Sequence, residues 1–153
     1  TTITSPGSQE IERSLFFEST EKQILDIFDR LPVEQQPRYL SHVGCGNGIF
    51  LSRLYHAIRT KTQRGKLLKE VPLTLVGIDS NQANQEAAAR TLADLPYLIV
   101  ANDLHDPSQL LNDLKKAYYR LHRKIMQQER VFNNRRKSAK KRIRHHRNQA
   151  IIF

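Results

Sequence analysis

Three glycines at alternate positions, Gly44, Gly46 and Gly48, form the part of the sequence best suited to holding a ligand. Glycine tolerates positive φ and lets the backbone approach a ligand closely. The free N–H groups at the start of a following helix favour a negatively charged or carboxylate-bearing partner. An apolar run at 39–43 precedes the glycines and a helical pattern follows them. This order predicts a strand, a tight turn and a helix that hold a nucleotide-like cofactor.

A carboxylate follows the next apolar run, 73–78, where the sequence continues with Asp79 and Ser80. A carboxylate at the tip of the second strand can accept hydrogen bonds from two ribose hydroxyls. A glycine-rich turn alone can be purely structural, so Asp79 is the residue that favours cofactor binding. The dinucleotide fingerprint would need a third glycine at position 49, where this chain has Ile49.

The glycine spacing resembles motif I of class I S-adenosylmethionine-dependent methyltransferases. A third apolar run, 97–101, leads into Asn102 and Asp103, where that family commonly has an acidic residue in contact with the adenine amino group. The resemblance implies S-adenosylmethionine as cofactor, with its methionine end on the glycine loop, its ribose on Asp79 and its adenine on Asp103. The cofactor-binding residues that it implies are His42, Gly44, Cys45, Gly46, Gly48, Asp79, Ser80, Asn102 and Asp103.

From about Glu12 to Lys116 the chain resembles one branch in particular, the methyltransferase domains of modular polyketide synthases. The supporting stretches are more specific than motif I and lie at 14–18, 64–68, 71–74 and 106–110. This resemblance implies transfer of a methyl group to a carbon or oxygen of a small-molecule or carrier-bound acceptor. It also implies a class I methyltransferase fold, of which this sequence contains about half.

Three positions depart from the family pattern. His42 stands where motif I usually begins with an acidic residue, Asn47 where a second acidic residue is frequent, and Asn102 where glycine is frequent. A neutral histidine can accept one hydrogen bond, but it brings no negative charge to an ammonium group. The departures together predict a weakened cofactor site.

The fold predicted from these patterns is α/β, a partial Rossmann-like, three-layer fold with about three parallel strands. Residues 1–36 form a helical lead-in, 37–114 the S-adenosylmethionine-binding half-domain, and 115–153 a basic tail, helical or disordered. Strands are expected near 38–43, 73–78 and 97–101, and helices near 48–59, 84–92 and from Pro107, with Asp106 as a cap. Nothing after Lys116 reads as a strand. The first strand is therefore expected to keep an open edge, a route to self-association.

Charge divides the chain near Lys116. Residues 1–114 carry 11 Lys and Arg against 14 Asp and Glu, a net −3, whereas residues 115–153 carry 14 against Glu129 alone, a net +13. Such a tail favours a second interpretation, a basic protein that binds RNA or another polyanion non-specifically through residues 115–153 on a degenerate half-Rossmann scaffold. A shift of the coding frame near Lys116 is a further hypothesis for the abrupt change.

The remaining features narrow the function classes. No run of 18 apolar residues and no signal-peptide pattern occur, so we expect a cytoplasmic protein without a membrane span. The single cysteine, Cys45, fits a tight turn better than a nucleophilic role, and adjacent His145 and His146 do not have metal-ligand spacing. No metal is expected. The segment that completes the acceptor site in the family is missing, so no catalytic residue is predicted and the domain is expected to be truncated.

Overall fold

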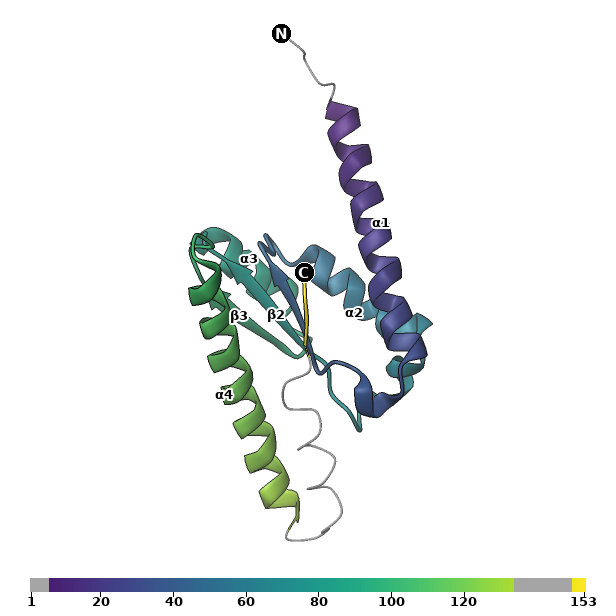
Figure 1. The fold of residues 1–153 in the computed structure, drawn as a ribbon, viewed down its shortest axis with the longest axis vertical. Helices are drawn as coiled ribbons and strands as arrows, with labels where there is room; N and C mark the ends of the chain where they lie inside the picture. Colours follow the sequence, from purple (N-terminus) through teal and green to yellow (C-terminus); the bar gives the residue numbers. More distant parts are fainter. Residues whose placement is uncertain (1–5, 134–149) are drawn as a thin grey trace.

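The computed structural model describes residues 6–133 and 150–153. In this part of the chain four parallel strands form one sheet in the order β3-β2-β1-β4, and helices cover both of its faces (Figure 1). The strands are β1 (Tyr39–Val43), β2 (Thr74–Asp79), β3 (Tyr97–Ala101) and β4 (Ala150–Ile152). The helices are α1 (Pro6–Arg30), α2 (Ile49–Lys61), α3 (Gln82–Thr91) and α4 (Pro107–Asn133), with short 3₁₀ turns at Val33–Gln35 and Gln63–Leu67. The predicted three-layer, partial Rossmann-like α/β fold is confirmed.

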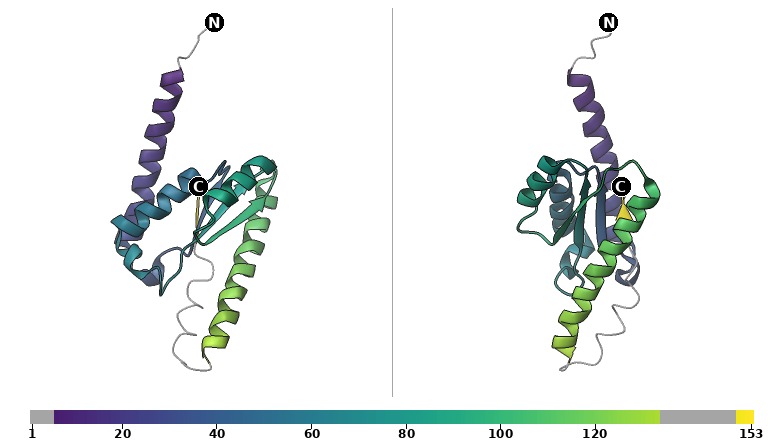
Figure 2. Two further views of the ribbon diagram at one scale, coloured as in Figure 1. Left: turned by 180° about the vertical axis from the view of Figure 1, so that it is seen from behind. Right: turned by 90° about the vertical axis from the view of Figure 1, so that its left-hand side faces the viewer.

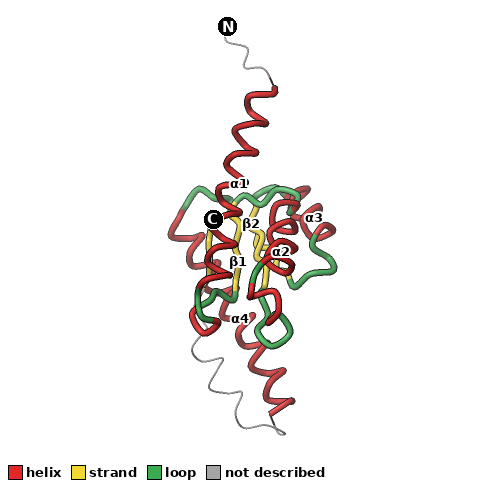
Figure 3. Tube along the Cα trace, turned by 90° about the vertical axis from the view of Figure 1, so that its right-hand side faces the viewer, coloured by secondary structure: helices red, strands yellow, loops and turns green. Residues whose placement is uncertain are grey.

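Alternation of side chains along the buried strand β2 builds one core on each face of the sheet. Leu75 packs on the side of α2 and α3, whereas Val76 and Ile78 pack on the other side against Leu114 of α4. Figure 2 shows the sheet between these two helical layers, and Figure 3 shows the strands β1 and β2 between the helices. All six residues of β2 are buried, as expected of a central strand in a parallel sheet.

The fourth strand corrects the prediction that nothing after Lys116 forms a strand. Ala150, Ile151 and Ile152 pair in parallel with Tyr39, Leu40 and Ser41 of β1. The pairing continues beyond β4, because Phe153 N donates to Ser41 O (2.9 Å) and Val43 N donates to Phe153 O (2.7 Å). The expected open edge on β1 is therefore covered, and the edges of the sheet are β3 and β4. A run of four apolar residues after a long basic segment is too short for a periodic signal.

The two long helices, α1 and α4, begin in different surroundings. The N-terminal half of α1 projects away from the sheet, and its Leu15 and Phe16 are more than half exposed (Figure 1). The start of α4 is capped as predicted, since Asp106 Oδ1 accepts from Ser108 N (2.9 Å) and Gln109 N (3.3 Å).

The basic run at 135–142 and the pair His145 and His146 lie outside the described residues. Within the described residues, none of the helices has the length and apolar character needed to cross a bilayer.

Candidate cofactor site beside the glycine loop

The glycine loop adopts the conformation that its composition requires. Gly44, Gly46 and Gly48 all have positive φ, at 74°, 57° and 77°, which L side chains rarely adopt. Gly44 N and Cys45 N both donate to Ile78 O, at 2.8 and 3.0 Å, so the loop is tied to the end of β2. A Cβ at Gly44 or Gly46 would meet no atom within 4 Å. The loop therefore faces open space at two positions, as a ligand-binding loop would.

Asp79 ends β2 directly beside this loop, as predicted. Its Oδ2 accepts from Gly46 N (3.0 Å), while its Oδ1 accepts from Asn81 N (2.9 Å) and Asn84 Nδ2 (3.3 Å). Burial alone would raise the pKa of Asp79, but these hydrogen bonds and one from the Ser80 backbone outweigh it and lower the pKa from its usual value. Asp79 is thus an ionised carboxylate at neutral pH.

A cavity of about 270 Å³ opens next to the loop. His42, Gly44, Cys45 and Asn47 line it from the end of β1 and the loop, and Ile49, Phe50 and Arg53 line it from α2, with Phe17 of α1 opposite. Phe17 and Phe50 pack with ring centroids 4.4 Å apart. The cavity is therefore a mainly apolar pocket with backbone polar groups on one side and an exposed guanidinium at its mouth.

His42 lines this cavity with a ring that is partly buried. Its ring stacks on Phe153 with centroids 4.5 Å apart, and its Nδ1 is buried without a hydrogen-bond partner among the described residues. Burial lowers the pKa of His42 from its usual value near 6.5, although nearby Asp79 acts in the opposite direction. His42 is therefore neutral at pH 7, and a neutral imidazole has one nitrogen free to accept a hydrogen bond.

The pKa of His42 makes stability depend on pH. Because the folded state holds His42 neutral at a pH where the unfolded chain already binds a proton, the free energy of unfolding should fall as pH drops below about 6.5. Urea unfolding at pH 7.5 and pH 5.5 measures the decrease. His42→Phe can keep the ring stack on Phe153 and should show a smaller decrease between the same two pH values. Equal decreases in the two proteins would contradict this assignment.

Cys45 is a packing residue in this loop. Burial raises the pKa of its thiol to about 11, so the thiol stays protonated at neutral pH and is a poor nucleophile. A Cβ on Gly77 of β2 would come within 2.9 Å of Cys45 Sγ. The sulfur therefore fills the space that Gly77 leaves open, in agreement with the structural interpretation of this cysteine.

The residues after β3 serve mainly to shape a loop. Asn102 is buried, and it donates through Nδ2 to Asp113 Oδ2 (2.7 Å) and accepts through Oδ1 from Leu104 N (2.8 Å). Leu104 has a positive φ of 64°, which these contacts support. Asp103 is exposed and accepts from His105 N (3.2 Å), and Ser80 is exposed after β2. Asn102 N donates to Asp79 O (3.3 Å), so this loop and the glycine loop flank the same carboxylate residue.

Several residues of the site were missed by sequence reasoning. Phe50 and Arg53 lie three positions apart on the first turns of α2, so their place on one helix face was a usable signal. Phe17 and Phe153 come from opposite ends of the chain, and only the fold brings them to His42 and Phe50. In the described parts of the chain, no three His, Cys, Asp or Glu side chains gather as metal ligands would.

A known protein family matches this chain. The family model of the AprA MT2-like domain, a methyltransferase family, matches residues 3–153. No curated protein matches the chain. The match extends through the basic segment, beyond the limit near Lys116 that the sequence resemblance predicted. The match supports the methyltransferase interpretation and gives no support to the polyanion-binding alternative.

Proposed function

Because the chain belongs to the AprA MT2-like family of methyltransferase domains, we propose that it binds S-adenosylmethionine at the glycine loop and serves methyl transfer to a small-molecule or carrier-bound acceptor. The observation that carries the proposal is the cavity beside the loop, which is lined by His42, the glycine loop and Arg53. The acceptor class rests on the resemblance to polyketide synthase methyltransferase domains.

Polar groups around the cavity fit the methionine end of this cofactor. The neutral His42 can accept a hydrogen bond from the ammonium group at the position where the family usually has an acidic residue. The exposed guanidinium of Arg53 offers a charge-assisted hydrogen bond to the carboxylate. Asp79 Oδ2 offers an acceptor to the ribose. The site thus has a partner of suitable chemistry for each charged group of the methionine end.

Apolar groups around the cavity fit the reacting end. S-adenosylmethionine, when bound, supplies an electrophilic methyl group on a positively charged sulfur. The packed rings of Phe17 and Phe50 line the cavity and would exclude water from it, and aromatic ring faces attract a cation. Charge interactions are stronger where water is excluded. These side chains would therefore help to hold the sulfonium without any anion beside it.

Calorimetric titration of S-adenosylhomocysteine into the wild-type chain and into Arg53→Gln tests the proposal. The variant should bind about 10-fold more weakly, since a hydrogen bond to a charged group contributes about 1.5–3 kcal/mol when well formed and less at an exposed site. Methylthioadenosine, which has no amino-acid carboxylate, should bind the two proteins equally. Arg59→Gln is the matched control, because Arg59 is an exposed arginine on α2 whose Nη2 lies 2.9 Å from His56 Nδ1.

Two results would contradict the cofactor assignment. One is the absence of saturable binding by wild-type protein that unfolds cooperatively in urea. The other is an equal loss of affinity in Arg53→Gln for S-adenosylhomocysteine and methylthioadenosine, which would place Arg53 away from the carboxylate.

A further inference from the structure

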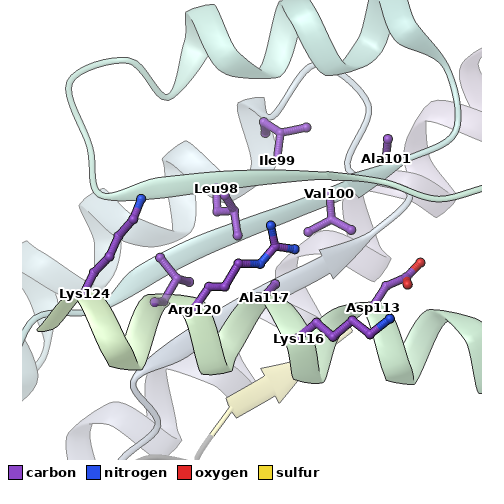
Figure 4. A pocket seen from close by; sticks show the side chains of 10 residues that line it. Leu98, Ile99, Val100, Ala101, Asp113, Lys116, Ala117, Arg120 and Lys124 are labelled. Carbon is purple, nitrogen blue, oxygen red and sulfur yellow. The ribbon is translucent and has the colours of Figure 1, made fainter. Parts of the chain in front are cut away.

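A second cleft, of about 370 Å³, lies on the far side of the sheet between α4 and the edge strand β3. Leu98 and Val100 of β3 form its floor together with Ala117 and Leu121 of α4. Figure 4 shows Arg120 and Lys124 reaching from α4 toward β3, with Lys116 lying along the helix toward Asp113. The cleft shares no lining residue with the cavity beside the glycine loop.

The cations of this cleft have no anionic partner among the described residues. Arg30 and Asp26 form the one ion pair found there, and Lys116, Arg120 and Lys124 are all exposed. Asp113 is the single acidic residue that lines the cleft, and its carboxylate already accepts from Asn102 Nδ2 (2.7 Å) and Gln109 Nε2 (2.9 Å). The cleft therefore carries a net positive charge that a ligand can neutralise.

Among the described residues, no strand pairs with the outer edge of β3, which forms part of the floor of the cleft. At the two ends of the β2–β3 pairing, Leu75 N donates to Pro96 O (2.8 Å) and Asn102 N donates to Asp79 O (3.3 Å). Successive residues of a strand direct their N–H and C=O groups to opposite sides. The even-numbered residues of β3 therefore hydrogen-bond to β2. The N–H and C=O groups of Tyr97, Ile99 and Ala101 consequently face the open edge, where another strand can pair.

We propose that this cleft binds an extended acidic segment of a partner protein, which adds a strand to the edge of β3. The cations repeat every four residues on α4, a spacing of about 6 Å at 1.5 Å per residue. Alternate side chains of a strand are about 6.6 Å apart and point to one face. Acidic residues at alternate positions of the added strand would therefore meet Lys116, Arg120 and Lys124 in turn, while its backbone pairs with β3.

Other anions fit this cleft less well. A single phosphate cannot contact cations that span about 12 Å of helix. No aromatic side chain lines the cleft, so the described residues offer nucleic-acid bases no stacking platform there. Lysines beside a sheet edge also discourage pairing with apolar or basic strands, which restricts the edge to acidic ones.

Binding of a labelled peptide with four glutamates alternating with three threonines tests the proposal by fluorescence anisotropy at about 50 mM salt. A matched peptide with proline in place of threonine has the same charge, but proline removes N–H donors and disfavours sheet pairing. The threonine peptide should bind at least about 10-fold more tightly than the proline peptide. In the complex, hydrogen exchange followed by NMR should slow at the amides of Tyr97, Ile99 and Ala101.

A chain with a net charge of +10 attracts any anion weakly, so binding alone does not locate the site. Charge-reversal variants show which cations the peptide contacts. The double variant Arg120→Glu/Lys124→Glu should lose at least about 10-fold in affinity for the threonine peptide. The control Lys115→Glu/Arg123→Glu makes the same charge change on α4 away from this cleft and should lose less than about 3-fold. Equal losses in both variants, equal binding of the two peptides, or tighter binding of a single-stranded RNA of equal charge that is lost on the same Arg120 and Lys124 changes would each overturn the proposal.

Discussion

Replacing Asp79 with alanine is expected to lower the affinity for S-adenosylmethionine at least about 100-fold, or about 2.7 kcal/mol. The carboxylate would accept hydrogen bonds from the ribose, and it also fixes the glycine loop through Gly46 N at 3.0 Å. Without it the N–H groups of Gly46, which is half-buried, and of Asn81, which is exposed, lose their partner, and each hydrogen bond to a charged group contributes about 1.5–3 kcal/mol at most. The variant thus loses both a direct contact and the shape of the loop. Isothermal titration calorimetry measures the affinity.

Two further variants distinguish the loss of a cofactor contact from a loss of folding. Asp79→Asn keeps the side-chain volume and one acceptor oxygen, so it should fold better than Asp79→Ala and still bind the cofactor poorly. Asp94→Ala removes an exposed acidic residue away from the site and should bind as the wild type does. Wild-type affinity in a folded Asp79→Asn protein would show that the carboxylate has no role in cofactor binding.

Gly48→Ala is expected to destabilise the protein by about 2–4 kcal/mol. Gly48 has a φ of 77°, and a left-handed conformation costs about 1–2 kcal/mol for a residue with a Cβ. Its added Cβ would also lie 3.2 Å from Ala88 Cα, which belongs to the backbone of α3 and cannot turn away. The start of α2 and the second half of α3 would have to move apart by a few tenths of an ångström. Urea unfolding measures the loss.

Gly46→Ala is the matched variant for this prediction. Gly46 has a comparable φ of 57°, but its Cβ would meet no atom within 4 Å, so about 1–2 kcal/mol is the expected destabilisation. For cofactor affinity the order of the two variants should be the opposite of that for stability, because the new methyl group at Gly46 enters the open space in front of the loop. Gly46→Ala is therefore expected to lose more affinity for S-adenosylmethionine than Gly48→Ala. Equal stability of the two variants would show that the packing against Ala88 has no energetic weight.

The predictable parts of this protein were those encoded by neighbouring residues. The three glycines and the apolar runs before and after them predicted β1, the loop, α2 and β2, since positive φ and strand patterns depend on local sequence. Asp79 was placed correctly because the carboxyl ends of neighbouring parallel strands meet at one edge of a sheet. The cap at Asp106 likewise depends only on residues within one turn.

The parts that escaped prediction depend on residues far apart in the chain. The strand β4 has three residues, and its identity comes from its pairing with β1 rather than from its own pattern. The cavity wall joins Phe17 to Phe50, and His42 is covered by Phe153. The departure at His42 was interpreted as a weakness of the site, yet burial turns its imidazole into a neutral acceptor. No sequence pattern reports burial of this kind.

The position of β4 in the sheet has a consequence for the order in which the chain folds. Strands β1, β2 and β3 can assemble while the chain is still being synthesised, but the other side of β1 waits for residues 150–153 to leave the ribosome. The entropic cost of closing a loop rises only slightly when the loop doubles in length. Contacts between residues far apart in the sequence nevertheless form slowly. A nascent chain would therefore expose this flank of β1 from the time that residues 39–43 leave the ribosome until residues 150–153 have followed them.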